Sequence, residues 1–140
     1  MTNTLKTLAT ALLALALTAP VQAQSGGLSV ELNRMDATDG GCSVYFVLEN
    51  GTGRSFEDLS LDLVMFDTEG VVASRLAVQF APLPAGKTAL RVFDVPNLAC
   101  GDMGRMLLND AVGCRDAEGR EGGCLAAVAT ASRTEVEFIK

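Results

Sequence analysis

Residues 42–67 read CSVYFVLENGTGRSFEDLSLDLVMFD and decide the fold. Apolar residues stand at every second position of 42–49, and the same alternation returns in 59–66. Period two is the pattern of a β-strand with one face in a core, so both segments are predicted strands. The segment between them, Asn50–Ser55, is rich in glycine and reads first as a hairpin turn.

Alternating segments also lie on both sides of this stretch. The further strands that we expect are 28–32, 71–80, 88–95, 104–112 and 136–138. Segment 104–112 is ambiguous between a strand and one or two helical turns, and we favour a strand. Seven short strands separated by turn signals at roughly ten-residue spacing predict an all-β, immunoglobulin-like antiparallel β-sandwich.

The expected topology places 42–49 beside 88–95 in one sheet and 59–66 beside 104–112 in the other. The last strand, 136–138, then completes the second sheet. Because 42–49 and 59–66 fall in opposite sheets, Asn50–Ser55 becomes a crossover between the sheets rather than a hairpin turn.

The first 23 residues have the pattern of a cleaved signal peptide. Lys6 precedes an uncharged apolar run, Leu8–Thr18, and Val21 and Ala23 are the small residues that signal peptidase needs. The run is too short for a bilayer core, which needs about 20 residues. We therefore expect cleavage after Ala23, no membrane anchor after cleavage, a single domain over residues 24–140, and a periplasmic or secreted protein.

The net charge of the chain after the signal peptide argues against some classes of partner. Removing Lys6 with the leader leaves 10 basic against 17 acidic side chains, a net charge of −7. Nucleic acids and anionic membrane surfaces are bound by cationic patches. The sequence therefore predicts no nucleic-acid partner. The expected partner is an unknown protein or envelope component.

Four cysteines lie after the signal peptide, and an oxidising compartment favours two disulfides. If strands 42–49 and 88–95 are antiparallel neighbours, Cys42 lies near the end of the second strand, close to Cys100. Cys114 and Cys124 then close the loop before the last strand. The expected pairs are Cys42 with Cys100 and Cys114 with Cys124.

The chain contains no histidine, which removes Ser-His-Asp and Cys-His catalysis and histidine-based zinc sites. We predict no catalytic residue, no metal and no cofactor. Two alternatives stay open. One is a carboxylate-dependent envelope hydrolase using residues such as Asp58 and Asp62. The other is a metal site built from methionine or aspartate, for which Met103 and Met106 are the nearest candidates.

The segment between Cys114 and Cys124 has no apolar periodicity and is charged, so we expect an exposed loop. A charged loop closed by a disulfide on a rigid sandwich is a common way to present a binding surface. The candidate partner-binding residues are Arg115, Asp116, Glu118, Arg120 and Glu121.

Leu63-Val64-Met65-Phe66-Asp67 followed by Gly70, and later Leu83-Pro84-Ala85-Gly86, resembles the bacterial β-sandwich modules called FxLYD-type domains. The chain after the signal peptide is also similar to uncharacterised small exported proteins of proteobacteria, often labelled as carrying a twin-arginine signal. These resemblances imply an immunoglobulin-like sandwich in the periplasm and bring no catalytic residue. The sequence thus favours an exported, non-enzymatic binding or structural module.

Overall fold

The computed structural model describes residues 26–140; the predicted signal peptide and the expected cleavage after Ala23 lie outside the described residues. Eight strands make up most of this part: β1 (Leu28–Thr38), β2 (Gly41–Asn50), β3 (Phe56–Asp67), β4 (Val72–Gln79), β5 (Thr88–Pro96), β6 (Met103–Asp116), β7 (Val128–Ser132) and β8 (Glu137–Ile139). Two short helices, η1 (Cys100–Asp102) and α1 (Cys124–Ala127), stand at the two ends of β6 in the chain.

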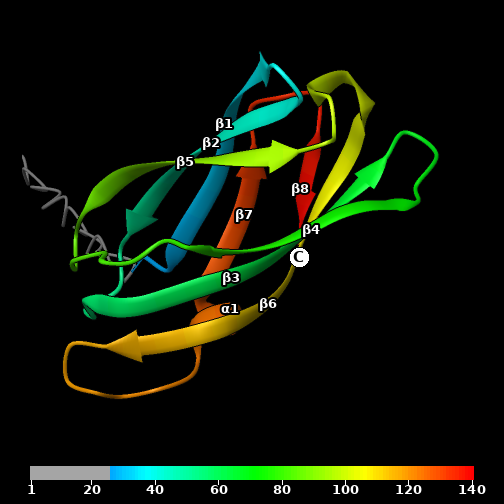
Figure 1. Ribbon diagram of the computed structural model, residues 1–140. Coiled ribbons are helices and arrows are strands. Elements are labelled where there is room, and N and C mark those ends of the chain that lie inside the picture. Colours follow the sequence, from blue (N-terminus) through cyan, green and yellow to red (C-terminus); the bar gives the residue numbers. More distant parts are fainter. Residues whose placement is uncertain (1–25) are drawn as a thin grey trace, which may run out of the picture.

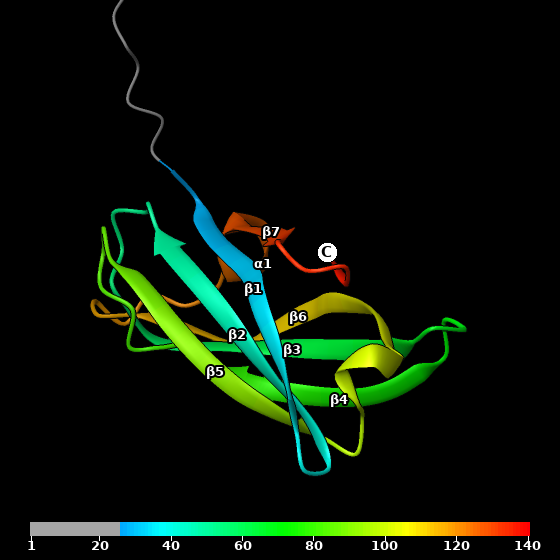
Figure 2. The ribbon, with the colours of Figure 1, turned by 90° about the horizontal axis from the view of Figure 1, so that it is seen from above.

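The strands form two four-stranded sheets, in the orders β5-β2-β1-β7 and β4-β3-β6-β8, which pack face to face (Figures 1 and 2). The expected all-β sandwich is confirmed. So are the expected neighbours, because β2 pairs with β5, β3 pairs with β6, and β8 adds to β6. Since β2 and β3 belong to different sheets, residues 51–55 cross between the sheets, as the revised interpretation of this segment requires.

The sheets are mixed, however, and not purely antiparallel as the sequence analysis expected. β7 runs parallel to β1, and β8 runs parallel to β6. The cause is the route of the chain after β6: it does not form a hairpin with β6 but passes through α1 to the first sheet. It then reverses between β7 and β8, where the Ser132 hydroxyl accepts a hydrogen bond from the Thr134 amide and the Arg133 amide donates to the Leu32 carbonyl.

The ambiguous segment 104–112 is a strand, and it is longer than expected. β6 continues to Asp116 and keeps its pairing with β3 through several irregularities in register. One of them leaves Val112 without a partner, since Ala111 pairs with Leu61 and Gly113 pairs with Ser60. Such bulges bend a strand and redirect its side chains.

An aromatic cluster in the core joins the two sheets. The ring of Phe46 on β2 is fully buried and lies 5.4 Å from Phe80, 6.2 Å from Phe93 and 5.7 Å from Phe138, measured between ring centroids. Phe93 belongs to the sheet of Phe46, and Phe138 belongs to β8 in the opposite sheet. Tilted and edge-to-face pairs at these distances are favourable beyond the area that they bury.

Two disulfides connect Cys42 with Cys100 and Cys114 with Cys124, the pairs that the strand order suggested. The first joins the start of β2 to η1, and the second joins the end of β6 to α1. Disulfides persist in non-reducing compartments outside the cytoplasm, so this pair of bonds indicates such an environment. Neither helix within residues 26–140 has the length and apolar character needed to cross a membrane.

Candidate functional site

The crossover between β2 and β3 is ordered by Asn50, which is only 2% exposed. Its Nδ2 donates to the carbonyls of Arg54, Leu83 and Pro84, and its Oδ1 accepts from the Thr52 amide and hydroxyl. Asn50 therefore holds the turn closed from inside. The backbone of Arg54 is fixed by this turn, so that its side chain extends toward the end of β6.

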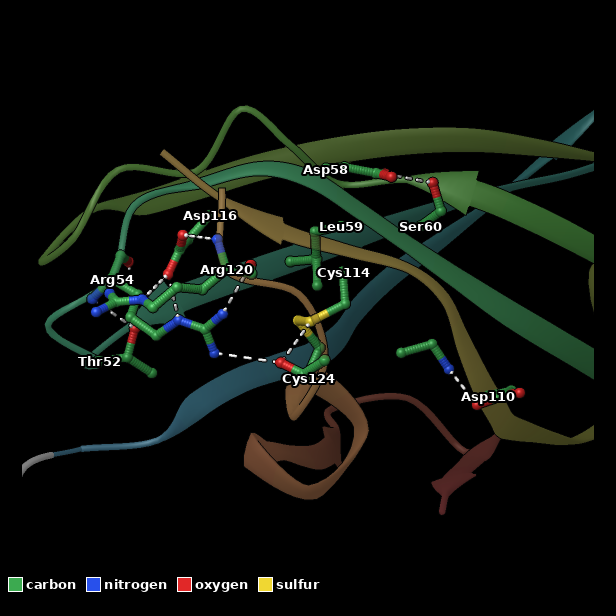
Figure 3. The surroundings of a disulfide bond; sticks show 12 residues. Thr52, Arg54, Asp58, Leu59, Ser60, Asp110, Cys114, Asp116, Arg120 and Cys124 are labelled. Atoms are coloured by element: carbon green, nitrogen blue, oxygen red, sulfur yellow. Dashed lines mark hydrogen bonds and ion pairs between the residues drawn. A yellow bond between two sulfur atoms is a disulfide. The ribbon is translucent and has the colours of Figure 1, made fainter. Parts of the chain in front are cut away.

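Asp116, the last residue of β6, is a fully buried carboxylate that receives four hydrogen bonds (Figure 3). Arg54 Nε donates over 2.8 Å and Arg120 Nε over 2.7 Å. The backbone amides of Glu118 and Arg120 supply the other two bonds. Asp116 thus joins the crossover to the loop that follows β6.

Arg54 also fastens the far side of this loop. Its guanidinium donates to the carbonyls of Arg120 and Gly122, and it lies over the ring of Phe56 at 5.2 Å from the centroid. The Cys114–Cys124 disulfide closes the base of the same loop, and the Gly122 amide donates to the Cys114 carbonyl. Residues 117–123 are therefore exposed and yet tied at several points.

The ion pairs set the pKa of the Asp116 carboxyl. Burial alone would raise this pKa, but the hydrogen bonds from Arg120 and Arg54 lower it far below the usual range of an aspartate. The same contact raises the pKa of Arg120. Asp116 is consequently a permanent anion near neutral pH, and its charge is balanced by two guanidinium groups.

Four of the five expected partner-binding residues lie on the surface: Arg115, Glu118, Arg120 and Glu121. Asp116 was wrongly expected to contact a partner. Its side chain is buried, because the Arg54 and Arg120 guanidinium groups and two loop amides all donate to its carboxylate. Arg54 was missed, since it stands 62 residues from Asp116 in the sequence and the local pattern around it signals only a turn.

An exposed apolar residue adjoins the loop. Val112, at the bulge in β6, is 58% exposed. It borders a depression of about 300 Å³ together with Arg115 and Glu121, so the bulge and the loop share one surface. We give the name loop face to this surface together with the other exposed charged residues of the loop: Val112, Arg115, Glu118, Arg120 and Glu121.

The loop face combines properties that suit recognition. Its backbone is fixed before any partner arrives, which lowers the entropy cost of binding. It presents charges of both signs beside one exposed apolar side chain, and interfaces combine polar and apolar contacts of these kinds.

Replacing Asp116 with alanine should free the loop while the sandwich stays folded. The amides of Glu118 and Arg120 lose their acceptor, so we expect their hydrogen exchange to become roughly fivefold to tenfold faster, the factor that one such hydrogen bond contributes. Amide exchange measured by NMR tests this. The control Glu118→Ala removes only an exposed contact to Arg120 and should leave both rates unchanged. Unchanged exchange rates in Asp116→Ala would mean that Asp116 does not hold the loop in place.

The lowered pKa of Asp116 also predicts how stability depends on pH. Its folded-state pKa is below the unfolded value of about 3.9, so its contribution is complete above that value and is lost as the pH falls through the folded pKa. We expect the unfolding free energy to decline from about pH 5 to pH 2. Because asparagine does not titrate, the unfolding free energy of Asp116→Asn should fall less over this pH range than that of the wild type. Denaturant titrations at each pH measure this free energy, and an equal fall in both proteins would refute the assignment.

The carboxylates considered for a hydrolase do not form an acid–base pair. Asp58 and Asp62 lie along β3 with separate partners: Asp58 accepts from Gln79 and Ser60, and Asp62 accepts two hydrogen bonds from Arg75 and one from Asn109. Asp62 is only 3% exposed and forms an ion pair with Arg75. Hydrogen bonds from Gln79 lower the pKa of Asp58, and those from Arg75 lower that of Asp62. The general acid of a glycosidase needs a raised pKa, and the pKa values of Asp58 and Asp62 are both lowered.

The methionines considered for a metal site are buried. Met106 is fully buried in the core, and Met103 is 3% exposed. Within residues 26–140 no three His, Cys, Asp or Glu side chains gather closely enough to hold a metal ion.

Fold and site together define a small all-β sandwich with two disulfides and a clamped, charged loop at one end. Comparisons with protein-family models, curated proteins and solved structures gave no match.

Proposed function

We propose that this chain is an exported, non-enzymatic binding module of the bacterial periplasm, and that the loop face contacts a protein or another envelope component. The observation that carries the proposal is the clamp: a buried Asp116 with two arginines and a disulfide fixes a loop whose own side chains remain exposed. The signal-peptide pattern supports export, and the two disulfides support a non-reducing compartment.

Capture from a periplasmic extract tests the proposal. The bait is the purified protein, and the test variant is Glu118→Lys/Glu121→Lys, which reverses two exposed charges of the loop face and leaves Asp116 and the disulfide intact. Since reversed charges oppose a complementary surface, we expect the bound partner to be lost. The matched control is Asp39→Lys/Glu49→Lys, which makes the same change of net charge at exposed positions outside the loop face.

The expected result is one partner retained by the wild type and the control and missing from the loop variant. Partners that survive the loop variant, or that disappear equally in the control, would refute the assignment of binding to the loop face.

A further inference from the structure

A second surface lies at the opposite end of β6, where β3 ends and β6 begins. Two adjoining depressions of about 480 Å³ and about 330 Å³ share Thr68 and Gly104 in their walls. β6 begins beside these depressions at Met103 and ends at Asp116. This surface and the loop face therefore lie at opposite ends of the same 14-residue strand (Figure 1).

The wall of the larger depression is partly apolar, with Thr68, Thr134 and Glu135 beside the apolar residues. Met35 on β1 is partly exposed there, whereas Met103 on β6 and Val136 before β8 are only 3% and 6% exposed and form its floor. Cys100 lies in the same wall, and its disulfide to Cys42 ties η1 to β2. Methionine side chains are flexible and polarisable and adapt to apolar groups of different shape. This volume is in the range of ligand-binding pockets.

The border of the two depressions is acidic. Glu135 lines the larger one, and Asp67, Glu69 and Glu137 line the smaller one. Arg105 is the cation in these linings, and its guanidinium is stacked 4.9 Å from the centroid of the Phe66 ring. Four carboxylates against one guanidinium give this end of the molecule a negative potential that attracts cations.

Exposed apolar residues continue this surface along the turn between β3 and β4. Val71 and Val72 follow Gly70 directly and are 61% and 58% exposed. Exposed apolar residues therefore follow Gly70, which lies in the wall of the smaller depression.

We propose that the two depressions form one docking groove, the acidic groove, for a basic protein segment that carries a large apolar side chain. The apolar side chain packs against Met35 and over the floor formed by Met103, and lysine or arginine residues beside it meet Glu69 and Glu135. The negative border selects against acidic segments by like-charge repulsion. This inference does not depend on the loop face.

Titration with synthetic peptides tests the groove. The probe is acetyl-Gly-Lys-Phe-Lys-Gly-amide; the comparison peptides replace both lysines with glutamate or the phenylalanine with serine. The readout is the NMR signal of ¹³C-labelled methionine methyl groups. We expect saturable shifts at Met35 and Met103 with the probe alone, while Met65 and Met106, both fully buried in the core, stay unchanged.

Two variants locate the binding. A Cβ at Gly101, in the wall of the larger depression, meets no atom within 4 Å, so Gly101→Phe can fill the space without a backbone clash and should abolish the shifts. Gly53→Phe has equal room at the other end of the molecule and should leave them unchanged. Glu135→Lys should weaken binding roughly fivefold, and the exposed control Glu49→Lys should have no effect.

Saturable shifts that Gly101→Phe removes would support the groove. The inference is overturned if Met35 and Met103 do not respond, if the glutamate peptide binds equally well, or if the two methyl signals shift with protein concentration alone, which would assign the groove to a second copy of the chain. None of these results bears on the loop face, whose test uses other variants.

Discussion

Phe46→Ala is expected to lower the unfolding free energy by about 3–5 kcal/mol, the usual cost of removing a buried phenylalanine side chain. Phe46 lies on β2, and its ring contacts those of Phe80 and Phe93 as well as Phe138 of the opposite sheet. The cavity would therefore open between the two layers of the sandwich, where neither sheet can close it alone.

Chemical denaturation measures this loss. Leu90→Ala serves as the control, because Leu90 is 56% exposed on β5 and its truncation should change stability by no more than about 0.5 kcal/mol. Similar losses in the two variants would mean that the aromatic cluster does not hold the sheets together.

Removing the Cys42–Cys100 disulfide by double alanine substitution should cost about 4 kcal/mol, since the bond closes a loop of 58 residues. It also releases η1 and the start of β6 from β2. A domain of this size has about 5–15 kcal/mol of stability in total, so the variant should lose a large fraction of its stability and unfold at a clearly lower temperature.

The second disulfide provides the matched comparison. Cys114→Ala/Cys124→Ala opens a loop of only 10 residues and should cost about 3 kcal/mol at most. Its characteristic effect is local, with faster hydrogen exchange in residues 117–123 while the sandwich persists. A larger stability loss from the second pair than from the first, measured by thermal unfolding, would contradict this ranking.

Most of the fold could be predicted from the sequence because period-two alternation is a local signal. Segments such as 42–49 and 59–66 carry it clearly, and the expected strand neighbours then suggested the disulfide pairs. The strand β7, with the sequence VATAS, was missed: only Val128 and Thr130 hint at alternation, and its pairing with β1 is parallel and distant in sequence. That pairing makes the first sheet mixed, and the parallel pairing of β8 with β6 makes the second sheet mixed; neither had a local signal.

The site could be predicted only in part, for the same reason. The loop between Cys114 and Cys124 was recognisable from its charges and from the closing disulfide. The clamp was not, because it depends on Arg54 reaching Asp116 across 62 positions. An aspartate in a charged loop looks solvated in sequence, and the partners that bury it, like Arg75 above Asp62, become visible only in three dimensions.

Site-specific photocrosslinking in living cells tests the central claim, that the loop face contacts a partner, most directly. A photoreactive phenylalanine analogue would replace Glu121 on the loop face or, as the control, Glu49, which is also exposed. The account predicts a discrete heavier adduct from position 121 and none from position 49. No adduct at position 121, or the same adduct at both positions, would contradict it.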